Sequence, residues 1–480
     1  MTRSWFGKRG RKAIGTTVLT MLLGSGVAAP ALAGDDGEAA FRSLYRELVE
    51  IDTTLSAGDC TAASRAMAAR LAAAGYPQAD LQILGPAERP REHALIATLH
   101  GSAGSTLAPL LLLAHVDVVE ARRADWQRDP FKLVEEDGWF YARGASDDKA
   151  MAAIFTDAMI RYRREGYRPR RDIKLALTCG EETSEQFNSV SWLLAHQPDA
   201  LKAAFALNEG AGGELDASGR PVSLQIQAGE KVYADFTLEI TNNGGHSSRP
   251  VADNAIYRLA AALQRLAAYT FPIALNDATR GYFQAQAALI GGTTAADMLA
   301  VLNTPPDDAA AARLWAINPG WNSMLRTTCV ATQLAAGHAP NALPQRATAN
   351  VNCRILPGVP VDQVQQDLQR IVADDGIAIR RSEDPVTAAA PPLTPAILAP
   401  VREVAARIWP GVPVVPTMTT GATDGRFLNA AGIPTYGLSG LFHDAEGSRA
   451  HGLDERIRVR SLMDGRRFLY DVVKRYGNAR

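Results

Sequence analysis

The first half of the chain alternates short apolar runs with longer segments of helical periodicity. Three runs have the length of buried strands, at Leu110–Ala114, Ile173–Thr178 and Ala203–Leu207. Helices are predicted before and between them, at about Glu38–Ile51, Thr61–Ala74 and Met151–Arg163. Strands that alternate with helices indicate an α/β sheet covered by helices on both faces.

From about Gly229 the pattern changes to the apolar–polar alternation of a half-buried antiparallel strand. Apolar residues occupy every second position from Val232 to Ile240, and a helix is predicted after Asp253. The elements predicted next are strands at about 325–334 and 347–356, a helix at 361–373 and a strand at 377–380. Strand, helix, strand, strand, helix, strand is the order of a ferredoxin-like fold.

The patterns together predict a two-domain α/β protein. The first domain has a central mixed sheet with helices on both faces and spans residues 34–229 and 387–480. The inserted ferredoxin-like α+β domain spans 230–386 and contains an Ala-rich helical excursion at about 273–318. Residues 387–400 are rich in Ala and Pro and are predicted to be a linker. Strands at 414–418 and 433–438 and a helix at 461–476 complete the chain.

The N-terminal segment has the features of an export signal. Basic residues at positions 8–12 precede an apolar stretch at 13–27, and Ala31 and Ala33 fit a cleavage site. Residues 1–33 are therefore predicted to be a signal peptide, with export to a periplasm or beyond. A membrane anchor is the alternative, but the apolar stretch is shorter than the roughly 20 residues that a span needs. No later stretch is predicted to cross a membrane.

Composition excludes some partners and leaves disulfides open. The 480 residues carry a formal net charge of −1, so no basic excess favours a nucleic-acid partner. Four cysteines are too few for a disulfide scaffold, and none has C-x-x-C spacing. An oxidising compartment would nevertheless permit a bridge.

Residues that can bind a metal follow three of the predicted strands. His115 and Asp117 come after the first, Glu181 and Glu182 after the second, and Glu209 after the third. Because strand ends in an open α/β sheet are where ligands bind, these side chains are expected to lie together. Each motif alone has an ordinary explanation. For Glu181 and Glu182 it is that adjacent carboxylates usually lie on a solvated face.

Two further segments add to this set. Asp147 and Asp148 follow a Gly turn before a helix, where capping explains one acid but not both. His451 lies in a loop before the last helix. Two cations that share a carboxylate would use all of these groups, and histidine with oxygen ligands suits zinc, with cobalt or manganese as substitutes.

These motifs resemble those of the zinc aminoacylase and carboxypeptidase family of metallopeptidases, which includes glutamate carboxypeptidase, carnosinase and acetylornithine deacetylase. In chain order they read His-x-Asp, Gly-Ala-Ser-Asp-Asp-Lys, Glu-Glu, Asn-Glu-Gly, Gly-Gly-His-Ser-Ser and His-Gly-Leu-Asp-Glu-Arg. The resemblance covers essentially the whole mature chain. Residues 422–426 and 451–456 are most similar to the Gly-X carboxypeptidase and N-acyl amino acid hydrolase branch.

The resemblance implies two zinc ions. His115 and Glu209 would bind one ion, Glu182 and His451 the other, and Asp147 would bridge them. Asp148 stands at a position that the family varies, so it is not assigned a role.

The same resemblance implies a hydrolase that cleaves an amide bond next to a free carboxylate in a small substrate. Glu181 would be the general base and later the acid that protonates the leaving amine, and Asp117 would orient His115. The substrate would be a small peptide, with an N-acyl amino acid as the alternative.

In the family the inserted domain is a lid and dimerisation domain. His246 would stabilise the oxyanion, often from the partner subunit of a dimer, and Asn341 would contact the substrate. Arg354 would grip the substrate carboxylate, although an exposed arginine on a sheet face is the alternative explanation for it. The excursion at 273–318 departs from shorter family members, so a homodimer is left open.

Other readings of the sequence carry less support. Gly437-Leu438-Ser439-Gly440 resembles the nucleophile elbow of a serine hydrolase, but Leu441 stands where a second Gly is needed. A metal-dependent peptide-binding protein is the non-enzymatic alternative. The intact Glu181 argues against it, because a binder needs no general base.

Cys329 and Cys353 are equally far in sequence from Asn341. If Asn341 lies near the centre of a turn, the two cysteines face each other across a hairpin. We therefore hypothesise a disulfide between them.

Overall fold

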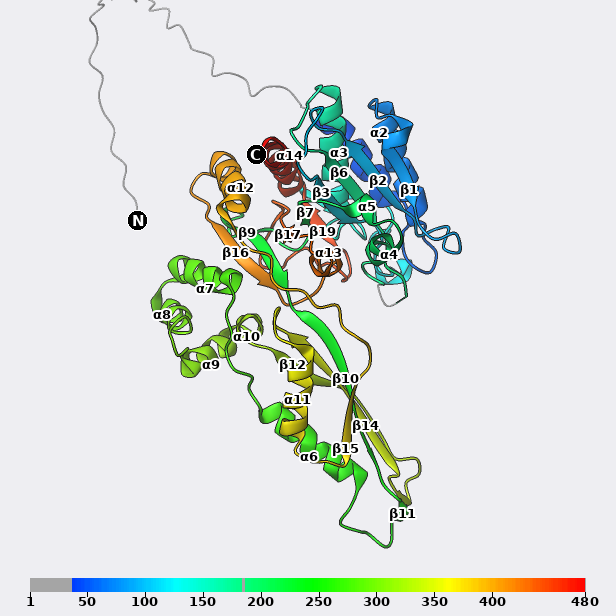
Figure 1. The fold of residues 1–480 in the computed structure, drawn as a ribbon, viewed down its shortest axis with the longest axis vertical. Helices are drawn as coiled ribbons and strands as arrows, with labels where there is room; N and C mark the ends of the chain where they lie inside the picture. Colours follow the sequence, from blue (N-terminus) through cyan, green and yellow to red (C-terminus); the bar gives the residue numbers. More distant parts are fainter. Residues whose placement is uncertain (1–36, 184–185, 480) are drawn as a thin grey trace, which may run out of the picture.

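The computed structural model describes residues 37–183 and 186–479, and Figure 1 shows its two sheets one above the other. The predicted signal peptide, residues 1–33, lies outside the described residues. Within those residues, no helix combines the length and the apolar composition needed to cross a membrane.

The larger sheet is mixed and carries the predicted central strands. Its order is β1-β2-β6-β3-β7-β17-β9-β8-β18, with β16 beside β9. β3 (Leu110–His115) lies between β6 (Ile173–Thr178) and β7 (Phe205–Asn208) and runs parallel to both, which confirms these three predictions. The other strands are β1 (Leu81–Leu84), β2 (Ala94–Leu99), β8 (Gly213–Leu215), β9 (Pro221–Glu230), β16 (Val414–Thr419), β17 (Thr435–Gly437) and β18 (Phe442–His443).

Helices cover both faces of this sheet, because alternate residues of its buried strands point to opposite sides. Leu110 and Leu112 belong to the core formed with α1, α2, α3 and α14. Leu111 and Leu113 belong to a second core, with residues of α4, α5 and α13. These helices are α1 (Glu38–Glu50), α2 (Cys60–Ala73), α3 (Lys149–Arg164), α4 (Ser189–His196), α5 (Pro198–Leu201), α13 (Gly425–Ala430) and α14 (Val459–Asn478).

The second sheet is antiparallel and has the predicted ferredoxin-like order. Its strands lie in the order β12-β14-β10-β15. The apolar positions of the strands pack on α6 and α11, and the other face is polar. The elements are β10 (Val232–Thr241), α6 (Ala255–Ala268), β12 (Thr328–Ala336), β14 (Arg346–Ile355), α11 (Val361–Val372) and β15 (Ile377–Arg381).

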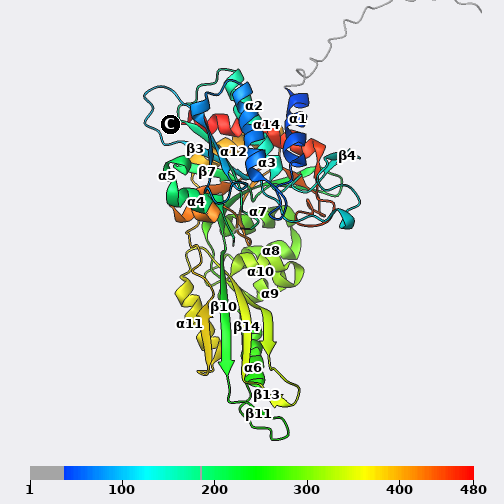
Figure 2. The same cartoon turned by 90° about the vertical axis from the view of Figure 1, so that its right-hand side faces the viewer.

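We call this sheet with α6, α11 and its end loops the projecting region, because it extends away from the large sheet (Figure 2). The short strands β11 (Gly245–His246) and β13 (Ala342–Leu343) pair with each other at its far end.

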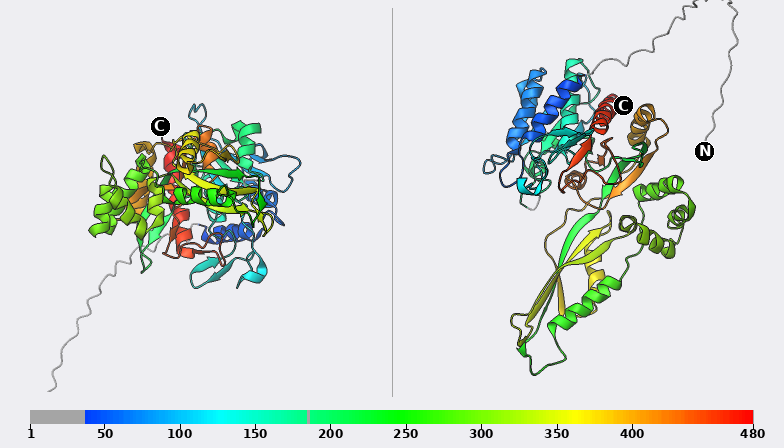
Figure 3. Two further views of the ribbon diagram at one scale, coloured as in Figure 1. Left: turned by 90° about the horizontal axis from the view of Figure 1, so that it is seen from below. Right: turned by 180° about the vertical axis from the view of Figure 1, so that it is seen from behind.

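The excursion predicted at about 273–318 is helical, continues to Leu325 and packs on the large sheet. It consists of α7 (Asp277–Ile290), α8 (Gly292–Ala300), α9 (Asp308–Ile317) and α10 (Pro319–Leu325). These helices share an apolar cluster with Val415 of β16, and they lie beside the junction of the two sheets (Figure 3). The buried Lys231 ammonium donates to the carbonyl oxygens of Ser323 and Arg326, each at 2.9 Å. The helices therefore brace the junction, and the strand predicted from residue 325 begins only at Thr328.

The predicted linker at 387–400 is partly wrong. Helix α12 (Pro395–Ile408) begins inside it, with Pro395 in its first turn and Pro400 further along. Proline is tolerated in a first turn, where its missing N–H is not needed, so Pro395 is compatible with a helix start, whereas Pro400 lies inside the helix. A three-stranded sheet was also not predicted, made of β4 (Val134–Glu136), β5 (Trp139–Tyr141) and β19 (Arg456–Arg458).

Two disulfides are present. Cys329 and Cys353 are paired across β12 and β14, which confirms the hypothesis drawn from their spacing. The bridge between Cys60 and Cys179 was not predicted, because its halves are 119 positions apart. It ties the first turn of α2 to the residue that precedes Gly180, at the edge of the site described next.

Candidate metal centre

The ends of three neighbouring strands bring the first group of side chains together. His115 is the last residue of β3, and Glu209 directly follows β7. After β6 the chain turns at Gly180, whose φ is +91° and where an added Cβ would lie 2.2 Å from the Phe187 carbonyl oxygen. Only glycine fits this turn, which carries Glu181 and Glu182 to the same edge of the sheet.

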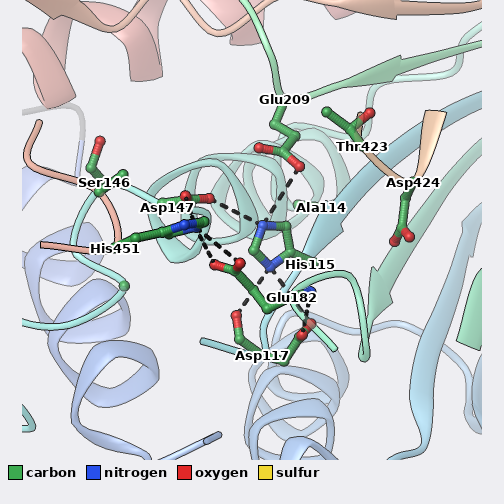
Figure 4. A network of polar contacts seen from close by, with 12 residues as sticks. Ala114, His115, Asp117, Ser146, Asp147, Glu182, Glu209, Thr423, Asp424 and His451 are labelled. Atoms are coloured by element: carbon green, nitrogen blue, oxygen red, sulfur yellow. Dashed lines mark hydrogen bonds and ion pairs between the residues drawn. The ribbon is translucent and has the colours of Figure 1, made fainter. Parts of the chain in front are cut away.

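Two loops complete the cluster from opposite parts of the chain. Asp147 precedes α3, and His451 lies between β18 and β19. One Asp147 oxygen lies 3.2 Å from Nε2 of His115, and its other oxygen lies 3.2 Å from Nε2 of His451. Glu209 Oε1 is 3.6 Å from Nε2 of His115, and Glu182 Oε2 is 2.9 Å from Nε2 of His451. Asp147 is therefore shared between two histidine–carboxylate groups (Figure 4).

Asp117 supports this arrangement in two ways. Its backbone carbonyl oxygen lies 3.0 Å from Nδ1 of His115, closer than its carboxylate at 3.6 Å. Its Oδ2 accepts the backbone N–H of Glu182 at 3.0 Å. The structure thus places the Asp117 carbonyl where the sequence analysis placed the carboxylate, and the carboxylate holds the turn that carries Glu182.

Both imidazoles of the cluster and the Glu209 carboxyl hold their protons more strongly than usual. Hydrogen bonds to Asp147 and Glu182 raise the pKa of His451 to about 10. Burial lowers the pKa of His115, but the carboxylates of Glu209, Asp117 and Asp147 outweigh burial and hold that pKa well above its ordinary value. Burial raises the pKa of Glu209 well above its usual range.

The residues present fit metal ions. Ligand atoms of His115, Asp147 and Glu182 all lie within 4.8 Å of one another, and so do those of His115, Glu181 and Glu209. A metal ligand must give up its proton, so cations could replace the protons that the imidazoles and carboxylates now share. Among the described residues, the buried oxygens Asp117 Oδ1 and Asp148 Oδ2 have no hydrogen-bond donor, so a nearby cation would compensate their burial.

Glu181 lies in this cluster with a carboxyl suited to proton transfer. Burial raises its pKa to about 8, and the nearby acids Asp424, Glu182 and Asp117 also raise it, against the opposite effect of His115. A carboxyl that exchanges protons near neutral pH can take a proton from water and return it to a leaving group.

Three acidic groups around the cluster were not among the predicted site residues. Asp424 is buried and accepts hydrogen bonds from Thr178 Oγ1 at 3.0 Å and Asn188 Nδ2 at 2.6 Å. Asp148 is also buried, with its carboxylate beside His115 and Asp147. The third is Glu455, whose contacts are described below. Asp424 and Glu455 stand inside the two segments singled out for their resemblance, which was the one available signal.

The three residues predicted in the inserted domain are not brought to the metal centre. His246 and Asn341 lie at the far end of the projecting region, where the Ser247 N–H donates to the Asn341 carbonyl oxygen at 3.0 Å. Arg354 lies on the polar face near the junction, with its guanidinium 4.6 Å from the centre of the Tyr233 ring. Arg354 stands eight strand residues after Arg346, the far end of β14, or roughly 26 Å away. One small substrate cannot touch both ends within a single chain.

The fold and the cluster define a metallohydrolase. The chain matches the model of peptidase family M20/M25/M40 over residues 111–475, and it belongs to that family. It is 30% identical over 379 residues to the N-fatty-acyl-amino acid synthase/hydrolase PM20D1 of Xenopus tropicalis, covering 74% of this chain and 70% of that protein.

Two further comparisons agree in family and fold. Aminoacylase-1 of Sus scrofa is 23% identical over 443 residues, covering 90% of this chain and 94% of its own. The structure of an M20 family metallo-carboxypeptidase, Sso-CP2 from Sulfolobus solfataricus, superposes with a TM-score of 0.66 at 20% identity, covering 91% of this chain and 99% of that one. The chain is thus an enzyme of the M20 metallopeptidase family, as its motifs predicted.

Proposed function

We propose that this enzyme is a dinuclear zinc hydrolase that cleaves the amide bond next to a free carboxylate in a small peptide or an N-acyl amino acid. The observation that carries the proposal is the division of the Asp147 oxygens between His115 and His451, each within 3.2 Å. In this assignment His115 and Glu209 hold one ion, Glu182 and His451 hold the other, and cobalt or manganese can substitute.

When bound, zinc supplies Lewis acidity that polarises a carbonyl group and lowers the pKa of water. Glu181 takes the proton from the attacking water and delivers it to the leaving amine nitrogen. Its position beside His115 and Glu209 supports this role. Asp117 keeps His115 and the Glu182 turn in place through its carbonyl and its carboxylate.

Arg354 is proposed to bind the substrate carboxylate. It stands on the side of the projecting region that faces the junction, and burial against neighbouring groups lowers the pKa of its guanidinium without removing its charge. A planar guanidinium can hold a carboxylate through two hydrogen bonds. Binding of the substrate by Arg354 requires that the projecting region close over the large sheet.

The projecting region is proposed to be both a lid and a dimerisation domain, inserted at residues 230–386 between the parts of a catalytic domain at 34–229 and 387–480. Its edge strand β12 runs over nine residues without a charge, and Val330 and Leu334 are 54% and 64% exposed. A long, uncharged edge is a template for another strand. The other edge, β15, is shorter and ends in two arginines.

Pairing of two β12 strands would form a homodimer and carry each far end toward the other subunit. Helix α6 adds Ile256 and Tyr257, which are 40% and 70% exposed. His246 and Asn341 would then reach the metal centre of the partner, where His246 stabilises the oxyanion. The length of β14 between the far end and Arg354 is consistent with one residue from each subunit.

Deacylation of N-acyl amino acids is a second candidate for the preferred reaction. It is favoured by the relative of 30% identity, which is described as an N-fatty-acyl-amino acid synthase/hydrolase. Peptidase and deacylase share the same metal chemistry and differ in the pocket beside the scissile bond.

Export from the cytoplasm is proposed from two observations. Residues 8–33 have the pattern of a signal peptide. Both disulfides in the described residues are of a kind that persists in oxidising compartments.

The proposal is tested by incubating the mature enzyme with a mixture of dipeptides and N-acyl amino acids, with and without a chelator, and identifying products by mass spectrometry. Chelator-sensitive cleavage that returns with zinc is the expected result, and the substrates consumed separate peptidase from deacylase. Absence of turnover by folded, zinc-loaded protein on every substrate would contradict the proposal.

A further inference from the structure

The side chain of Glu455 is fully buried behind the metal centre, four residues after His451. It belongs to the same loop as His451 but faces away from the cluster and toward the segment that carries Asp147. Its carboxylate accepts four hydrogen bonds from that segment, and no other carboxylate near the cluster is surrounded in this way among the described residues.

Each oxygen of Glu455 receives two donors. Oε2 accepts from an Arg143 guanidinium nitrogen at 2.8 Å and from the Gly144 N–H at 3.0 Å. Oε1 accepts from the backbone N–H groups of Ser146 at 2.8 Å and Asp147 at 3.0 Å. The turn from Arg143 to Asp147 is therefore wrapped around one carboxylate, in the way that backbone nests enclose an anion.

The loop that supplies His451 needs such an anchor. Arg449, His451 and Asp454 all have positive φ, at +58°, +62° and +51°, which costs energy for residues other than glycine. Arg143 also donates to the Gly452 carbonyl oxygen at 3.0 Å and stacks on Trp126. The Glu455–Arg143 pair thus ties the His451 loop to the Asp147 turn on both sides.

We propose that Glu455 is a positioning residue that sets the separation of Asp147 and His451. Through that separation it sets the affinity of the centre for zinc. This inference rests on the proposed dinuclear function. The role needs two acceptor oxygens. In Glu455→Gln, an NH₂ group replaces one of the two oxygens. Whichever oxygen it replaces, the NH₂ group faces two N–H donors and cannot accept from them, so the turn cannot close around the side chain.

The test compares metal binding by folded wild type, Glu455→Gln and Asp157→Asn, using zinc titration in a competing chelator. Asp157 is a matched control, because it is a buried carboxylate on α3 that pairs with Arg466 and contacts none of the proposed ligands. Both substitutions break a buried carboxylate–arginine pair. We expect Glu455→Gln alone to weaken zinc binding by about 10- to 100-fold, as removal of groups that orient metal ligands does.

Kinetics add a second readout. Activity of Glu455→Gln should recover with excess zinc, whereas Asp157→Asn should need no added metal. Should Glu455→Gln not fold, Glu455→Asp keeps both oxygens on a shorter side chain and is expected to bind zinc at an intermediate affinity. Wild-type zinc affinity in folded Glu455→Gln or Glu455→Asp, or equal weakening in Asp157→Asn, would overturn the inference. Failure of the wild type itself to bind zinc would instead refute the proposed function.

Discussion

The metal centre and the far end of the projecting region carry the two halves of the predicted site, and they are built very differently. The centre is assembled within one chain from strand ends and loops, with His115 and Glu455 almost completely buried. At the far end, His246 is exposed on a two-residue strand, and its Nδ1 contacts only its neighbour Ser248 among the described residues. The first half is preorganised, whereas the second would act at the centre only through a moving domain or a second subunit, as in the proposed function.

This difference shows where the chain fixes geometry by its own packing. Metal ligands need positions accurate to a fraction of an ångström, and buried strands with anchored turns provide them. Groups that act after the substrate has bound can be carried by a mobile element, because closure itself then excludes water.

The largest expected effect comes from removing the carboxylate shared by both histidines. Asp147→Ala should lose both ions and all measurable turnover, because its two oxygens each contact one of the two histidines. Metal content by mass spectrometry and activity on the best substrate check this. Asp297→Ala is the control away from the centre, since that half-buried carboxylate on α8 pairs with Arg313 of α9. Retention of two tightly held ions by Asp147→Ala would show that the centre is not built around it.

Glu181→Gln should separate metal binding from catalysis. We expect kcat to fall by about 10²–10⁴-fold, the usual contribution of a general base, with metal content unchanged. A small fall in kcat would assign the proton transfer to another group, such as Asp424, whose charge acts on Glu181.

His246→Ala tests whether the far end contributes to the reaction. The expected loss is about 10²–10³-fold in kcat, typical of one oxyanion donor. Mixing His246→Ala with Glu181→Gln under subunit exchange should then restore activity, because a mixed dimer has one complete site. Random exchange predicts about one quarter of wild-type activity. No recovery in proven mixed dimers would place His246 in its own chain's site.

Val330→Lys should disrupt pairing of the β12 edges, because a charge on an edge strand opposes strand addition. Sedimentation should show monomers, and activity should fall in parallel with His246→Ala. Ala378→Lys places the same charge on the opposite edge, β15, and should leave the dimer intact. A fully active monomer would show that closure needs no partner.

The smallest effect is a pH dependence at the junction. Glu230 accepts hydrogen bonds from the Thr423 N–H at 2.9 Å and Oγ1 at 2.5 Å, and burial raises its pKa to about 7. Between its unfolded pKa of 4.5 and about 7, the folded state holds a proton that the unfolded state has lost. The contribution of Glu230 to the free energy of unfolding is therefore fully present below pH 4.5. It is lost as the pH rises toward 7, by roughly 1 kcal/mol per pH unit. Glu230→Gln should flatten this slope in denaturant unfolding from pH 5 to 7, and an unchanged slope would refute the assignment.

The sequence predicted much of this structure because its strongest patterns are local. The buried runs at β3 and β6 and the alternation along β10 depend on residues within one element, and these predictions held. The proposed metal ligands stood out in the sequence because each directly follows such a strand or lies in a distinctive loop motif. The ends of elements were less accurate, as the first turn of α12 at Pro395 shows.

The features that could not be predicted depend on contacts between residues far apart in the sequence. Cys60 and Cys179 meet only because α2 packs beside the end of β6, and no local signal marks that contact. Glu455 reads as one acid in a polar loop until Arg143 and the Asp147 turn are placed around it. Asp148 gave the ordinary signal of a helix cap, although folding buries it beside His115.

The wide separation of Glu182 and His451, 269 positions apart, also sets an order of events on the ribosome. At about 5–20 residues per second, roughly 10–60 s pass between the emergence of these two residues. During that time the whole projecting region is synthesised. The Asp147 turn lacks both the His451 imidazole and the Glu455 carboxylate until this synthesis is over. Until His451 is made, the nascent chain therefore holds only one of the two histidine–carboxylate groups that share Asp147.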